Sequence, residues 1–275
     1  MHPGQIARAA RSNVAFHDAT FNVQKSVTVL HAAFEAQEVA ARRAGDVEAE
    51  QAWAAHRLAV EAAIWAGNNA SLDYLTAHAG YTRVGKHGGT AGRWEDAHDW
   101  TVASFFQHDS RNRDPHLHIH NAILNRVQGP DGKWRTIDWE VAKREKAACG
   151  AVGERVMFGR LVATLGLQVA MRPDGISREI MGVDQAVMDL FSTRTHDITA
   201  KTAALAQAHE ARFGRPPNAL QLDRLKRQAT LATRPGKEHT GETAQERSDR
   251  WDHMVRDVEE GLRAELAGGL AAVAW

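Results

Sequence analysis

One strand-like segment constrains the fold more than any other part of the sequence. Residues 115–127 alternate between two faces, one with His116, His118, His120 and Ala122 and the other with Leu117, Ile119, Asn121 and Ile123. A repeat of two residues is the period of a β-strand and does not fit a helix. We therefore expect this segment to be a strand of an antiparallel sheet, with a row of histidines along one face.

Helical and strand-like segments alternate along the rest of the chain. We expect residues 14–21 to form a strand with Phe16, Asp18 and Thr20 on one face, and Asn22 to cap the helix that follows. Further strands are expected at residues 100–106, 134–138 and, as a pair, within 167–181. Helices are expected at residues 25–43, 46–78 and 139–165, and through most of the chain after residue 183.

This order of elements predicts an α+β fold, in which helices flank one antiparallel sheet and a helical C-terminal part follows. We place the division between a core at residues 1–182 and the helical part at residues 183–275.

The composition and the N-terminal sequence indicate a protein of a reducing compartment. Cys149 is the only cysteine, so the chain cannot form an intramolecular disulfide, and a reducing compartment fits best. The N-terminus lacks the apolar segment of a secretory signal, and no apolar run is long enough to insert into a membrane. We therefore expect a cytoplasmic protein. A formal net charge of zero, from 34 basic and 34 acidic residues, does not favour binding to polyanions in general.

The histidines of residues 115–127 suggest a metal site. His118 and His120 are two residues apart, so their imidazoles project from the same face of the strand. His108 precedes the loop that leads into this strand, and a strand–loop–strand return brings it beside the pair. Asp18 is a candidate acceptor for the N–H group of a ligand histidine. His116 shares the face, and spacing alone does not decide which two of the three histidines bind.

The alternative is that these are ordinary surface or core histidines, because the chain contains 15 of them. A lone His-x-His pattern on a strand is therefore not a specific signal for a metal.

Two runs resemble motifs of the TrwC/TraI-type (MobF) conjugative relaxases, a branch of the His-hydrophobe-His nucleases. The run from Phe106 to Ala122, which includes Asp114-Pro115 and His118-Ile119-His120, resembles the family's histidine motif. The run Asp18-Ala19-Thr20-Phe21-Asn22-Val23-Gln24-Lys25-Ser26-Val27 resembles its Asp-x-Thr-Phe-Ser-x-x-Lys-Ser-Val segment. Two motifs in the same order are far more specific than one. The resemblance covers most of the chain and is weakest after residue 240.

The resemblance implies a palm-like antiparallel sheet with helices around it. It also implies that His108, His118 and His120 bind a divalent metal, Mg²⁺ or Mn²⁺ with Zn²⁺ as the alternative, and that Asp18 orients a ligand histidine. His116 falls where the family often has a polar residue that is not a ligand. The interval from His108 to His118 is one residue shorter than in the best-known members.

In such relaxases a tyrosine hydroxyl attacks a phosphate of single-stranded DNA, commonly beside a hairpin, at the origin of transfer. The metal polarises a non-bridging phosphate oxygen, and the product is a phosphotyrosyl linkage. The partners that the resemblance implies are therefore this DNA and the conjugation machinery. Five basic side chains around the expected site are candidate phosphate contacts: Arg111, Arg113, Arg126, Lys133 and Arg135.

The tyrosine nucleophile is not found. The family's catalytic tyrosines precede the segment that begins at Asp18, and no tyrosine precedes it here. Tyr74 and Tyr81 are the only tyrosines, and both are expected to pack rather than to react. We interpret the chain as a relaxase fragment without its N-terminal tyrosine segment, which leaves its status as an enzyme open.

Two alternatives remain. One is a nuclease-dead remnant that binds DNA and metal without cleavage. The other is a metal hydrolase that uses activated water on the same three histidines.

Overall fold

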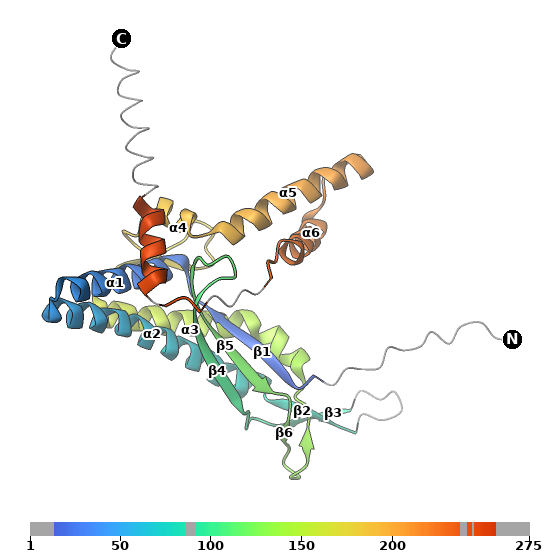
Figure 1. Ribbon diagram of the computed structural model, residues 1–275. Coiled ribbons are helices and arrows are strands. Elements are labelled where there is room, and N and C mark those ends of the chain that lie inside the picture. The colour runs from blue at the N-terminus through green and yellow to red at the C-terminus, as the bar shows by residue number, and fades with distance from the viewer. Residues whose placement is uncertain (1–13, 86–91, 237–240, 244, 257–275) are drawn as a thin grey trace. The chain divides into compact units, whose positions relative to one another are not determined.

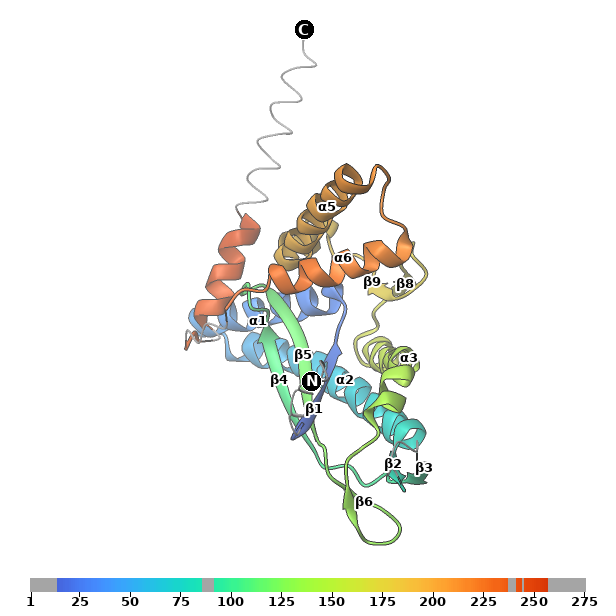
Figure 2. The same ribbon diagram turned by 90° about the vertical axis from the view of Figure 1, so that its right-hand side faces the viewer.

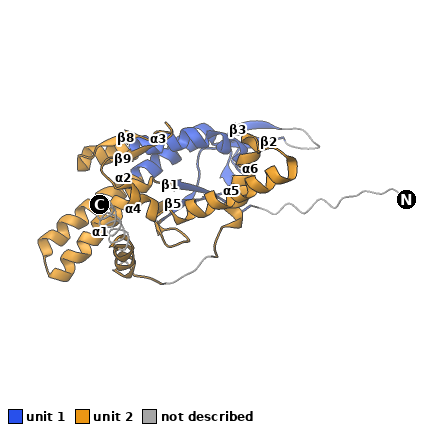
Figure 3. Cartoon of the chain, turned by 90° about the horizontal axis from the view of Figure 1, so that it is seen from above, with its two compact units in different colours: residues 1–21, 66–106, 119–156 blue, residues 22–65, 107–118, 157–275 orange. Residues whose placement is uncertain are grey.

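The computed structural model describes residues 14–85, 92–236, 241–243 and 245–256. It is an α+β structure, as expected from the sequence (Figure 1). Its strands form small antiparallel sheets, where the sequence analysis expected one sheet. The chain divides into two compact units, shown in different colours in Figure 3. Unit 1 comprises residues 1–21, 66–106 and 119–156, and unit 2 comprises residues 22–65, 107–118 and 157–275.

A three-stranded sheet in the order β1-β5-β4 contains the histidine-rich strand. Its strands are β1 (Phe16–Asn22), β4 (Val102–Asp109) and β5 (Pro115–Leu124). In unit 1, the amide of Asn125 donates to the carbonyl of Ala15 at 2.9 Å, and the amide of Leu124 donates to the carbonyl of Thr101 at 2.9 Å. The expected strand at 115–127 is thus correct over most of its length, but β5 ends at Leu124.

Two short hairpins complete the strands of unit 1. In the first, β2 (Tyr81–Val84) pairs with β3 (Arg93–Asp96) in antiparallel register. In the second, β6 (Val127–Gln128) pairs with β7 (Trp134–Arg135), which is the return expected after the turn. Two helices contribute to unit 1, namely the C-terminal part of α2 (Val47–Ala79) and the N-terminal part of α3 (Trp139–Leu165).

The core of unit 1 joins these strands to the helices. Ile123, Val127 and Ile137 are buried together with Ala97. The partly buried side chains that pack against them include Leu72, Trp100 and Trp139. The apolar face expected for β5 is therefore packed at its C-terminal end.

Unit 2 contains a hairpin of two helices, α1 (Lys25–Ala44) and the N-terminal part of α2, which lie side by side in Figures 1 and 2. Gly45 ends α1 with φ 71°, a left-handed conformation that glycine adopts at little cost. The expectation that Asn22 caps α1 is wrong, because β1 extends through Asn22 and the N-cap is Gln24, without a side-chain cap. Asn22 instead accepts a hydrogen bond from His116 Nε2 at 3.3 Å.

The remainder of unit 2 is mainly helical. A short hairpin of β8 (Val169–Met171) and β9 (Arg178–Ile180) matches the strand pair expected there. The helices that follow are α4 (Gln185–Leu190), α5 (Thr193–Phe213) and α6 (Ala219–Ala232), and residues 245–256 are also helical. Within the described ranges, no helix combines the length and the apolar character that a membrane crossing requires.

Candidate metal centre

Strand β5 carries His116, His118 and His120 at alternate positions. The boundary between the two units falls after His118, so His120 belongs to unit 1 and the other two histidines belong to unit 2.

In unit 1, His120 is held by the first strand. Its Nδ1 lies 3.0 Å from Oδ1 and 2.8 Å from Oδ2 of Asp18, and 3.2 Å from Oγ1 of Thr20. Asp18 and Thr20 lie on the same exposed face of β1, as the two-residue alternation predicts. When Nδ1 donates its proton to the carboxylate, Nε2 keeps its lone pair. This is the arrangement in which an acidic partner orients a metal-binding histidine.

In unit 2, His118 is fixed by the backbone of its own strand. Its Nδ1 lies 2.8 Å from the carbonyl oxygen of His116, and the side chain is buried. A donor at Nδ1 again leaves the lone pair on Nε2. The neighbouring ring of His116 lies 4.8 Å from that of His118, centroid to centroid, and its Nε2 is engaged by Asn22.

His108 lies near the end of β4, in unit 2. Burial, together with the positive charge of Arg247, lowers the pKa of His108 to about 4. The imidazole is therefore neutral at pH 7, which is the form that binds a metal.

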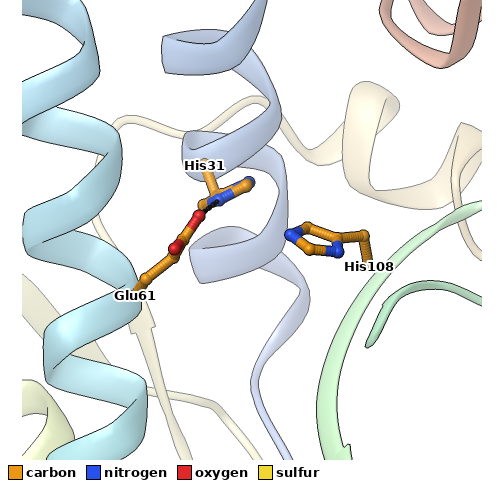
Figure 4. Close-up of side chains that lie close together, drawn as sticks. All are labelled: His31, Glu61 and His108. Carbon is orange, nitrogen blue, oxygen red and sulfur yellow. Dashed lines mark hydrogen bonds and ion pairs between the residues drawn. The ribbon is translucent and has the colours of Figure 1, made fainter. Parts of the chain in front are cut away.

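The structure also brings His108 together with two residues that the sequence analysis missed. His31 on α1, Glu61 on α2 and His108 each offer one ligand atom, and these atoms all lie within 4.8 Å of one another (Figure 4). His31 could have been noticed, because it follows Val27 by four residues and so shares the buried face of α1. No sequence signal distinguishes Glu61 from the other acids of α2.

The five candidate phosphate contacts differ in how they are engaged. In unit 2, Arg113 forms an ion pair with Glu242 at 2.5 Å, and Arg111 donates to the carbonyl of Pro235 at 3.2 Å. In unit 1, Arg135 forms two hydrogen bonds of 2.6 Å with Asp131, and Arg126 donates to the carbonyl of Asn125.

Lys133 and Arg135 also line a pocket of about 720 Å³ in unit 1. Arg83 and Asp138 contribute to the same wall. The guanidinium of Arg83 is paired with Asp138 at 2.5 Å. The pocket thus gathers three cationic side chains, two of which have acidic partners.

Both tyrosines are engaged in unit 1. The hydroxyl of Tyr74 donates to Glu145 Oε2 at 3.1 Å, and its ring lies 4.2 Å from that of His78. Partial burial and the contact with Glu145 raise the pKa of Tyr74, which is opposite to the change that activates a nucleophile. The ring of Tyr81 packs 6.1 Å from that of Trp94.

The family model described as TrwC relaxase matches residues 2–258. Among solved structures, a copper-bound conjugative relaxase TrwC in complex with oriT DNA is 25% identical with a TM-score of 0.66, over 89% of this chain and 71% of that chain. TrwC in complex with mutant oriT DNA is 25% identical with a TM-score of 0.66, over 93% and 80%.

A metal-bound TrwC in complex with oriT DNA is 25% identical with a TM-score of 0.63, over 89% of this chain and 72% of that chain. No curated protein matches the chain. Because the family model spans most of the sequence, the chain belongs to the TrwC relaxase family.

Proposed function

We propose that the chain acts on single-stranded origin-of-transfer DNA with an adjacent hairpin, as a site-specific DNA strand transferase that depends on a divalent metal. The family membership supports this proposal, as do the similar TrwC structures in complex with oriT DNA. One of these relatives binds a 27-mer that comprises the recognition hairpin and the cleavage site. The observation that carries the proposal is the pair of Asp18 with His120, which orients an imidazole on β5.

We place the metal on His108, His118 and His120. The residues fit this role because His118 and His120 each engage Nδ1 and leave Nε2 as the donor atom, while His108 is neutral at pH 7. Three neutral ligands leave coordination positions open for a phosphate oxygen. A divalent ion bound there, Mg²⁺ or Mn²⁺ with Zn²⁺ as the alternative, supplies charge that stabilises the phosphate as negative charge develops on it.

The protein's own side chains position the DNA. We assign five basic side chains as contacts to backbone phosphates. Arg126, Lys133 and Arg135 belong to unit 1, and Arg111 and Arg113 belong to unit 2. Arg135 and Arg113 exchange an acidic partner for a phosphate when they bind, so their contribution to affinity is reduced by the ion pairs that they give up.

The state of the tyrosines favours a second candidate, a protein that binds DNA and metal without cleavage. Strand transfer requires a hydroxyl that can be deprotonated, and the hydroxyl of Tyr74 has a raised pKa and an acidic partner. Tyr81 is packed against Trp94. Neither residue matches the family's position for a catalytic tyrosine.

Incubation with a single-stranded oligonucleotide that carries a hairpin, in Mn²⁺ or Mg²⁺, tests both candidates. A covalent protein–DNA band that survives denaturing electrophoresis supports strand transfer. A gel shift without cleavage supports binding alone, and cleavage without an adduct supports hydrolysis by activated water. The matched control is a His118→Ala/His120→Ala variant, which we expect to retain the fold but to lose metal-dependent cleavage. If this variant cleaves as the parent does, the metal assignment is wrong.

A further inference from the structure

A group of three metal-binding side chains lies entirely within unit 2. His31 extends from α1, Glu61 from α2 and His108 from β4. Figure 4 shows the imidazole of His108 facing the pair formed by His31 and Glu61. From this arrangement we propose that His31, Glu61 and His108 form a binding site for a divalent transition-metal ion such as Zn²⁺ or Co²⁺.

The ligand atoms of this group are those of a known type of zinc site. Two imidazoles and one carboxylate bind Zn²⁺ in catalytic sites that keep a fourth position open for water or substrate. Nitrogen-rich sets favour zinc, cobalt, nickel and copper, whereas Mg²⁺ prefers oxygen ligands and keeps several waters. The proposed ion therefore differs in class from Mg²⁺.

The distances are close to those of a bound state. Ligand atoms about 2.1 Å from a tetrahedral ion lie about 3.4 Å from one another. Here all three ligand atoms lie within 4.8 Å of one another. Nε2 of His31 lies 2.9 Å from Oε1 of Glu61 in a hydrogen bond, and an ion that binds both atoms takes the place of the shared proton, which moves to Nδ1 or to solvent. The farther donors have to approach by on the order of 1 Å, which side-chain torsions can supply without moving the helices.

The surrounding charges can adapt to an added cation. Arg57 donates to Glu61 Oε1 at 2.7 Å, so an ion competes with this guanidinium for the carboxylate. Arg57 keeps a second acidic partner, because its Nε donates to Glu38 at 2.7 Å. The other nearby guanidinium, that of Arg247, is neutralised by Glu35 at 2.8 Å. Metal binding thus leaves neither arginine without an acidic partner.

The burial of the ligand side chains favours metal binding at this position. The side chain of His31 is 2% exposed and that of Glu61 is 20% exposed. Ligands held in such surroundings lose little conformational freedom when an ion binds, so a site at this position is preorganised. Because His108 also belongs to the set proposed for the relaxase reaction, an ion on His31 and Glu61 competes for this imidazole.

Co²⁺ binding to the purified full chain tests the proposal, with visible absorption and titration calorimetry as readouts. The measurement uses the His118→Ala/His120→Ala variant, so that it does not depend on the proposed function. We expect this variant to bind one Co²⁺ with the absorption of a four-coordinate ion, and excess Mg²⁺ not to displace it.

Adding Glu61→Gln, which preserves the size of the side chain but removes a charged ligand, should weaken Co²⁺ binding by at least about tenfold, because the loss of a mere hydrogen-bonding partner of a ligand already costs about 10- to 100-fold. Adding His31→Ala should do the same, provided that circular dichroism shows an intact fold, and Glu61→Gln decides the question if His31→Ala unfolds. The matched control is His56→Ala, which removes an exposed histidine of α2 and should leave binding unchanged.

Two results would overturn the proposal: no Co²⁺ binding in the His118→Ala/His120→Ala variant, or binding there that Glu61→Gln does not weaken. Failure of the proposed function is seen separately, as metal-dependent cleavage that survives the His118→Ala/His120→Ala change.

Discussion

Both carboxylate oxygens of Asp18 lie within hydrogen-bonding distance of His120 Nδ1, at 3.0 and 2.8 Å. The two residues come from different strands and are separated by 102 positions in the sequence. A histidine whose Nδ1 is held by a carboxylate cannot turn its ring freely, and its Nε2 is more basic than in an isolated imidazole. We therefore propose Asp18 as a positioning residue, which would act on a bound metal through His120.

Asp18→Asn should therefore weaken metal binding by about 10- to 100-fold, as expected when the partner of a metal-binding histidine is changed. The amide has nearly the shape of the carboxylate but lacks its charge, so the fold should persist. Titration calorimetry measures the affinity for Mn²⁺. The measurement is made in a Glu61→Gln background, so that the second metal site proposed in unit 2 does not contribute to the binding signal. The control is Asp99→Asn, which changes an exposed acid of the same unit. Equal affinities in the two variants would show that Asp18 does not support a metal ligand.

Asn121 should be important for stability, because its side chain holds several elements of unit 1 together. Its Nδ2 donates to Asn68 Oδ1 at 2.7 Å and to the carbonyl of Ala19 at 2.9 Å, and its Oδ1 accepts from Ser104 at 2.6 Å. Asn68 and Asn121 are 0% and 2% exposed, so water cannot replace these bonds.

Asn121→Leu should lower the free energy of unfolding by roughly 3 kcal/mol or more, because each buried polar group left without a partner costs about 1–3 kcal/mol. Ser104→Ala, which removes one of the bonds, should cost about 1 kcal/mol. Urea denaturation gives both values. A loss in Asn121→Leu no greater than that in Ser104→Ala would show that the hydrogen bonds of Asn121 with Asn68 and Ala19 do not contribute to stability.

The sequence predicted the elements whose periodicity is carried by many residues. The expected helix at 139–165 coincides with α3, and the expected helix at 25–43 ends one residue before α1 does. The alternation along residues 115–127 identified β5 and its histidines. It did not predict the end of β5 at Leu124, because the two-residue alternation continues through Asn125 to Val127, whereas in the structure Val127 belongs to β6 and pairs with β7.

The candidate site was predictable only in part, for a physical reason. His118, His120 and Asp18 were singled out because strand periodicity and two motifs mark them, and the structure brings Asp18 into contact with His120. The contact of His31 with Glu61 depends on the register of two helices that are packed side by side. Thirty positions separate the two residues in the sequence. The apolar spacing of each helix shows which face is buried, but it does not show which residue of the other helix lies opposite. The same holds for the acidic partners of Arg113 and Arg135, which only the folded chain brings into contact.

Gly153 should not tolerate a side chain, because α3 approaches α2 closely at this position. A Cβ atom at Gly153 would lie 2.0 Å from Ser71 Oγ, 2.6 Å from a ring carbon of Phe21 and 2.7 Å from the carbonyl oxygen of Gly67. Two of these neighbours, the carbonyl and the ring, cannot move without disturbing the packing. Gly153→Ala should therefore destabilise the protein by about 1–3 kcal/mol or more.

Gly150→Ala is the matched control, one turn earlier on α3, where a Cβ atom would meet nothing within 4 Å. It should stabilise the protein by about 0.5–1 kcal/mol through the helix propensity of alanine. Thermal unfolding of both variants measures the two effects. A stabilising effect of Gly153→Ala would contradict the close approach of the two helices.

Glu242 should make the stability of the protein sensitive to acid. Arg250 donates to both of its oxygens at 3.0 Å, and Arg113 donates to one of them at 2.5 Å. The hydrogen bonds from Arg250, with the charges of Arg250 and Arg113, lower the pKa of Glu242 in the folded protein. Because the folded-state pKa is below the unfolded one, this contribution is fully present above the ordinary glutamate pKa of about 4.3 and is lost as the pH falls below it.

Glu242→Gln should consequently reduce the free energy of unfolding at pH 7 by about 1–3 kcal/mol, the range for hydrogen bonds to a charged group. The difference between the variant and the parent should shrink as the pH falls from about 5 to about 3, because the parent then loses the same charge by protonation. Denaturation curves at several pH values measure the difference, with Glu210→Gln, an exposed acid of α5, as the control. A difference that stays constant over this range would assign the loss to packing, since only a contribution of the ionised carboxylate disappears on protonation.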